Sequence, residues 1–110
     1  MIDWSRVIEL RDEVGAEDLE EVVELFLEEV EATLSDLSPD ADAKTLAEQM
    51  HFLKGSSLNL GFSDLAQICA DGERNAGDGN CGAINLEDVQ TCYAQSKTTF
   101  LANLSDQIAA

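Results

Sequence analysis

The stretch HFLKGSSLNLGF, residues 51–62, holds the only histidine of the chain and lies within a pattern typical of a helix. Apolar and small residues recur here at spacings of three and four, which is the period of one helix face. This stripe comprises Leu46, Met50, Leu53, Ser57 and Leu60. The pattern predicts a helix from about residue 42 to residue 60, and Gly61 is a typical helix stop.

The segments on either side of this helix show the same period. Upstream, residues 16–37 are predicted to form a helix whose first half is rich in glutamate and aspartate, which suits the positive end of the helix dipole. Its predicted stripe comprises Leu19, Val23, Phe26, Val30, Thr33 and Leu37. Ser38 and Pro39 end it.

Two more helices are predicted downstream. Ser63 can cap a helix that runs to about residue 76 and turns Leu65, Ile68 and Cys69 inward. After a loop rich in glycine and asparagine, Asn85 can cap a last long helix. The inner side of that helix comprises Val89, Tyr93, Phe100, Leu104 and Ile108.

These patterns predict an all-α fold. Four amphipathic helices joined by short loops are typical of an antiparallel up-down-up-down four-helix bundle. Residues 3–10 can form a short additional N-terminal helix. A length of 110 residues suits one core, so we expect a single domain over residues 1–110.

The composition argues against several classes of function. With 23 acidic and 6 basic residues the formal net charge is −17, whereas nucleic acids and anionic membranes require a basic face. No apolar run approaches the roughly 20 residues that span a bilayer, and no signal pattern opens the chain. Three cysteines at unrelated spacings and one histidine supply no zinc ligand set without carboxylates. We therefore expect a cytoplasmic protein with reduced thiols and no bound metal.

His51 is predicted to point away from the core. With Leu46 placed at zero and a turn of about 100° per residue, His51 lies near 140°. By the same arithmetic Lys54, Gly55, Leu58 and Phe62 share its face. Gly55 costs the helix about 1 kcal/mol relative to alanine and leaves space one turn from the imidazole. Leu58 and Phe62 are apolar where water is expected, which indicates a partner surface or packing by the N-terminal segment.

The charges around His51 suit an anionic group on the imidazole. No acidic residue occurs from Gln49 to Ser63, and Lys54 is the only charged side chain there. Neutral imidazole is a good nucleophile near neutral pH when an acceptor holds a proton on its other nitrogen. Glu73 follows the Gly61 turn at about the height of His51 on an antiparallel helix, so it is a candidate acceptor. The alternatives are an ordinary surface histidine and one more solvated glutamate.

The segment His51-Phe52-Leu53-Lys54-Gly55-Ser56-Ser57, with Leu60-Gly61 after it, resembles the histidine-containing phosphotransfer (Hpt) domain family. The pattern is H-x-x-K-G-[SA]-x-x-x-[LIV]-G, and most of the chain is similar to the family. Phe52, and the absence of a proline shortly after the histidine, argue against the dimerisation helix of a sensor kinase.

The resemblance implies a phosphorelay role in two-component signalling. His51 would be phosphorylated at Nε2, Lys54 would contact the phosphoryl oxygens, and Gly55 would leave room for the partner. Glu73 would hold the other imidazole nitrogen, and Leu58 would help to dock a receiver domain. The partners would be receiver domains of response regulators or hybrid kinases. The chain would be a monomer and a phosphocarrier without a kinase site or cofactor of its own, because the receiver supplies Mg²⁺.

Three other interpretations remain open. The bundle could bind receivers without transferring phosphoryl groups. It could be a phosphohistidine phosphatase, although that activity needs a second catalytic group near His51. It could also be an Hpt domain excised from a larger sensor kinase.

Overall fold

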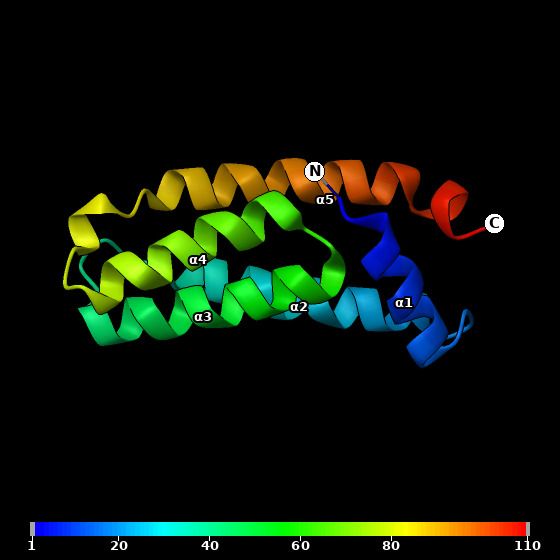
Figure 1. Cartoon of the computed structure of the whole chain (residues 1–110), viewed down its shortest axis with the longest axis horizontal. Helices are drawn as coiled ribbons and strands as arrows, with labels where there is room; N and C mark the ends of the chain where they lie inside the picture. Colours follow the sequence, from blue (N-terminus) through cyan, green and yellow to red (C-terminus); the bar gives the residue numbers. More distant parts are fainter. Residues whose placement is uncertain (1, 110) are drawn as a thin grey trace.

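The computed structural model describes residues 2–109, which form five α-helices and one turn of 3-10 helix (Figure 1). This confirms the predicted all-α bundle with an additional N-terminal helix. The first helix is longer than predicted, because it continues to Val14. The elements are α1 (Trp4–Val14), α2 (Leu19–Asp36), α3 (Ala43–Leu60), α4 (Ser63–Gly77), η1 (Cys81–Ala83) and α5 (Leu86–Ile108).

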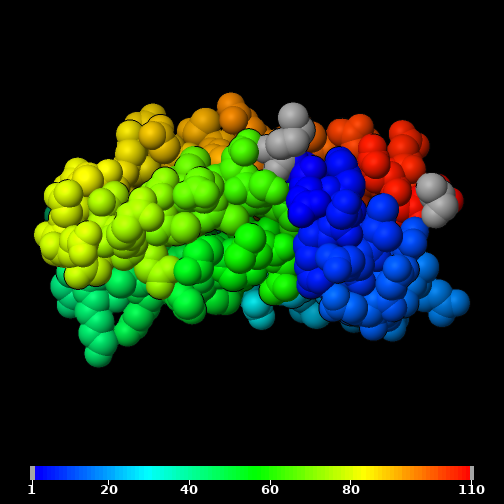
Figure 2. All heavy atoms as spheres, in the orientation of Figure 1, coloured from blue at the N-terminus to red at the C-terminus, as the bar shows by residue number. Residues whose placement is uncertain are grey.

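The four long helices run side by side along a molecule of 45 × 20 × 20 Å. In Figure 1, α3 and α4 lie in front, α5 runs along the top and α2 lies behind them. Helices α3 and α4 make the most extensive contact of any helix pair. Helix α1 crosses one end of the bundle (Figure 1), where Trp4 stacks on Phe100 with ring centroids 5.6 Å apart. Figure 2 shows α1 packed against the end of α3 and α4. None of the helices described here is long and apolar enough to cross a membrane.

The turn between α3 and α4 depends on Gly61. Its φ of 74° is a left-handed conformation that favours glycine. A Cβ at this position would lie 2.5 Å from the backbone oxygen of Asp3, so the turn also has no room for a side chain. The Asp3 amide donates a hydrogen bond to the Gly61 carbonyl at 2.7 Å. The turn is thereby fixed to the N-terminal segment.

Phe62 is fully buried, which contradicts its predicted place on a partner surface. Its ring lies edge-on to Phe100 at 5.3 Å and tilted against Tyr93 at 6.3 Å. The prediction extended the helical angles of α3 beyond the end of the helix. The left-handed Gly61 turns the chain there, so Phe62 enters the core. Ser63 is likewise the first residue of α4 rather than its cap, which is Phe62.

The core face of α2 differs partly from the predicted stripe. Leu19, Val23 and Val30 are buried as predicted, but Leu27 and Leu34 take the places assigned to Phe26 and Thr33. Each pair consists of adjacent residues, so either one continues a spacing of three or four. The other faces agree more closely: Leu65, Cys69, Val89, Tyr93 and Phe100 are all buried. Asn85 caps α5 as predicted, because its side chain accepts a hydrogen bond from the Asp88 amide.

Candidate functional site

His51 lies on the exposed face of α3, and its side chain is 70% exposed. Its neighbours Met50 and Leu53 are fully buried. These two anchors fix the rotation of α3, so the imidazole is held at the surface as the helical angles predict.

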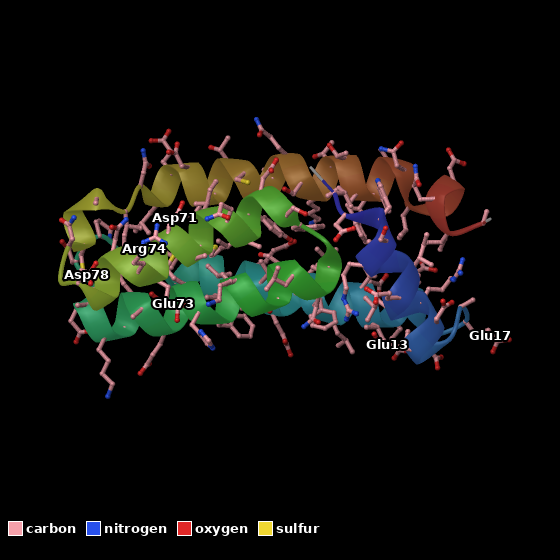
Figure 3. The ribbon with its side chains drawn as sticks, in the orientation of Figure 1. Glu13, Glu17, Asp71, Glu73, Arg74 and Asp78 are labelled. Carbon is pink, nitrogen blue, oxygen red and sulfur yellow. The ribbon has the colours of Figure 1, made fainter. Side chains whose placement is uncertain are left out.

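Glu73, on α4, meets the imidazole. Its Oε2 lies 2.8 Å from Nδ1 of His51, and Figure 3 shows Glu73 on the side of α4 that faces α3. The sequence predicted only that the two residues share a height along the bundle. The structure adds the close approach of the helices: a Cβ on Gly72 would lie 2.8 Å from the sulfur of Met50. Gly72 and Met50 directly precede Glu73 and His51, so this glycine brings the two side chains within reach.

Lys54 completes a three-residue cluster. Its Nζ donates a hydrogen bond of 2.6 Å to Oε1 of Glu73, so one carboxylate contacts both the ammonium and the imidazole. The hydrogen bond from Lys54 is the main reason why the pKa of Glu73 is lowered, and the contact with His51 adds to it. Glu73 is therefore ionised at neutral pH. Glu73 and Lys54 are both about one third exposed, so water reaches the cluster.

The contact between His51 and Glu73 determines which imidazole nitrogen is nucleophilic. An ionised carboxylate can only accept hydrogen bonds, so the partner nitrogen Nδ1 must carry the proton. In the neutral ring Nε2 then keeps its lone pair. The arrangement is that of a nucleophile oriented by an acceptor, with a cation one helical turn away.

Gly55 and Leu58 lie on the same helix as His51. An ideal Cβ on Gly55 would meet no heavy atom within 4 Å, so no contact within the described chain requires a glycine here. Leu58 is 55% exposed, in agreement with its predicted position. Phe52, next to His51, is 38% exposed and was not predicted as a surface residue. The exposure of Phe52 could have been predicted from the sequence, because its helical angle of about 240° from Leu46 places the ring off the core stripe.

The described residues contain no group of three or more His, Cys, Asp or Glu side chains placed to hold a metal ion. The three cysteines have free thiols, and burial raises the pKa of the Cys69 thiol to about 12.

The sequence is similar to those of two phosphorelay proteins. The chain is 28% identical over 98 residues to the phosphorelay intermediate protein YPD1 of Candida albicans, which is 83% of this chain and 52% of that protein. It is 32% identical over 69 residues to multistep phosphorelay regulator 1 of Schizosaccharomyces pombe, covering 60% of this chain and 23% of that protein. The chain thus spans about half the length of the first relative and less of the second. No solved structure shows a significant match.

The model of the Hpt domain family matches residues 21–108. That range contains α3, α4 and α5 with the whole His51 cluster. The chain therefore belongs to the Hpt domain family.

Proposed function

We propose that the chain is a phosphorelay intermediate that carries a phosphoryl group on Nε2 of His51. It accepts this group from the phosphorylated aspartate of a receiver domain, or from a kinase, and passes it to an aspartate of another receiver. The observation that carries the proposal is the 2.8 Å contact between Nδ1 of His51 and an ionised Glu73, on an imidazole that remains 70% exposed.

In the accepting step the Nε2 lone pair attacks phosphorus. An N–P bond forms, the P–O bond of the aspartyl phosphate breaks, and the aspartate leaves with the bonding electrons. The Nδ1 proton stays on the ring, facing Glu73, so no proton transfer is needed in this step. The donating step is the reverse, with a second aspartate as the nucleophile. Glu73 keeps the ring in one orientation and tautomer throughout.

Lys54 changes partners in this scheme. In the structure its ammonium is paired with Oε1 of Glu73. A phosphoryl group on Nε2 brings two negative charges close to this ammonium, and it attracts the ammonium more strongly than the single charge of the Glu73 carboxylate does. Lys54 would then turn from Glu73 to the phosphoryl group. This change of partner by Lys54 stabilises the phosphorylated state of His51, and Glu73 stays in place beside the imidazole.

The docking surface in this proposal is the exposed part of α3 around His51. Phe52 and Leu58 supply apolar area, and Gly55 lets the partner backbone approach the imidazole. The receiver supplies Mg²⁺ and most of the stabilisation of the transition state. The chain itself then needs no nucleotide site and no cofactor, and it acts as a monomer.

The test is transfer of radiolabelled phosphoryl from a phosphorylated receiver domain to the wild type and to a His51→Gln variant. Label should move to the wild type only and be lost in acid but kept in base, as expected of a phosphohistidine. Binding without transfer across a panel of receivers would instead favour an interaction module. Release of label as free phosphate, with no phosphoprotein formed, would favour a phosphatase.

A further inference from the structure

A second surface lies between α2 and α5, away from the helices that carry the His51 cluster. Two hollows lie along the line of contact between these two helices, with volumes of about 770 Å³ and about 440 Å³. Leu101 lines both, so the two hollows adjoin at this side chain, and together they are called the groove below. On α2 the lining extends from Ala16, just before the helix, to Leu37, just after it. At 1.5 Å per residue this is about 30 Å, the length of a helix of about 20 residues.

Apolar side chains run along the floor of the groove, and in the larger hollow Tyr93 and Lys97 of α5 also donate hydrogen bonds across it to Glu31. Leu27 and Leu34 of α2 are buried beneath it, while Leu104 and Ile108 of α5 are half-buried along it. Leu101 is 50% exposed at the point where the hollows meet, so the described chain leaves half of this large apolar side chain uncovered. An apolar strip of this kind, bordered by polar residues, is typical of a binding surface.

The two walls of the groove differ in charge. The α2 wall carries Glu20, Glu24 and Glu31, and α2 contains no lysine or arginine. The α5 wall is almost uncharged, and its single charged residue, Lys97, donates a 2.7 Å hydrogen bond to Glu31. Because Glu31 is already paired, a basic occupant is attracted by Glu20 and Glu24 at the smaller hollow, on the α2 side only.

We propose that this groove docks an amphipathic helix of a partner protein. The partner helix lays an apolar stripe over Leu101, places lysine or arginine residues along the α2 wall, and presents neutral polar residues to the α5 wall. This is the helix-in-groove mode of recognition, with the charge difference between the walls fixing which flank of the helix faces α2.

A second copy of the chain does not meet these requirements. Five of its six basic side chains already pair with its own carboxylates: Arg6, Arg11, Lys54, Arg74 and Lys97. A second α2 would add acidic residues to an acidic wall. The groove also shares no residue with the His51 cluster, so an anchored partner would leave the imidazole accessible to a receiver.

The proposal can be tested with synthetic helical peptides of about 20 residues. The first carries an apolar stripe with lysine and arginine on one flank and serine and glutamine on the other. The second exchanges the two flanks, and the third is a scrambled sequence of the same composition. Affinities are measured by fluorescence anisotropy at two salt concentrations, and the bound site is mapped by amide chemical shifts.

Both flanked peptides should bind with saturation, at least tenfold more tightly than the scrambled peptide, because a helix that reverses its direction in the groove keeps its basic flank on the α2 wall. Leu101→Ser should weaken that binding about tenfold, and Glu20→Gln with Glu24→Gln should reduce its salt dependence. Leu25→Ser is the matched control, because Leu25 is 54% exposed on α2 and does not line the groove. Equal binding of the scrambled peptide, an equal effect of both leucine variants, or dimerisation that is lost in Leu101→Ser would overturn the proposal.

Discussion

Replacing Gly55 by alanine should stabilise the protein and at the same time slow phosphoryl transfer. Gly55 lies inside α3 with an ordinary helical backbone, and a Cβ there would meet no heavy atom within 4 Å. The folded chain by itself therefore gains nothing from a glycine at this position. The substitution separates what the fold requires from what a partner requires.

The gain in stability follows from helix propensity. Alanine is favoured over glycine inside a helix by about 1 kcal/mol, because glycine loses more backbone freedom on folding. No steric cost offsets this gain, since the new methyl group enters open space. For a chain of this size 1 kcal/mol corresponds to an increase in melting temperature of about 4 °C.

The loss of activity follows from the position of the new methyl group. Residues four apart on a helix are neighbours, with Cβ atoms about 5–6 Å apart, so the methyl group lies beside His51. A receiver displaced by about 1 Å would lose in-line geometry at phosphorus, which costs on the order of a hundredfold in rate. We expect transfer to slow by about tenfold to a hundredfold while His51 stays intact.

Calorimetry and single-turnover transfer from a phosphorylated receiver measure the two effects on the same preparation. Gly82→Ala is the control, because its methyl group also enters open space but lies on η1, outside α3 and α4. A Gly55→Ala variant that is less stable than the wild type would show that the space near Gly55 is occupied in the folded chain. Unchanged transfer would refute the idea that a partner approaches His51 over this glycine.

Three further predictions concern the packing and charge around the site. Phe62→Ala should cost about 3–5 kcal/mol in the free energy of unfolding by urea, because the ring is fully buried; a surface residue would cost less than 1. Gly72→Ala should lower the melting temperature despite its better helix propensity, because its Cβ would press on the Met50 side chain, and overpacking costs about 1–3 kcal/mol. The Lys97 hydrogen bond lowers the pKa of Glu31, so its stabilising contribution is present above the ordinary pKa of 4.5 and is lost as the pH falls through the folded-state value. The difference in melting temperature between wild type and Glu31→Gln should therefore shrink between pH 6 and pH 3, and a constant difference would contradict this.

Much of the helical arrangement could be predicted from local patterns. The ends of α3 follow from periodicity and from Gly61, and the capping role of Asn85 follows from its side chain. The outward direction of His51 follows from its angle to Leu46, since one helix face must be buried. These features depend on neighbours within a few residues, which a sequence displays directly.

Other features depend on contacts between distant segments. Phe62 was misplaced because its direction is set by the left-handed Gly61 and by Phe100, beyond the range of helical angles. The α2 core face was ambiguous because Phe26 and Leu27 both fit the spacing, and only packing against the other helices selects Leu27. The same limit applies to the site. The position of Glu73 along the bundle axis could be calculated from the sequence, but the direction of its side chain toward α3 could not.

The helices, the family resemblance and the exposure of the single histidine can be predicted without a structure, because they follow from local periodicity and a short motif. Three features emerge only in the folded chain: the close approach of α3 and α4 at Gly72, the contact of Glu73 with both His51 and Lys54, and the groove between α2 and α5. A helix fixes directions around its own axis, whereas the distance and rotation between two helices are set by the side chains packed between them.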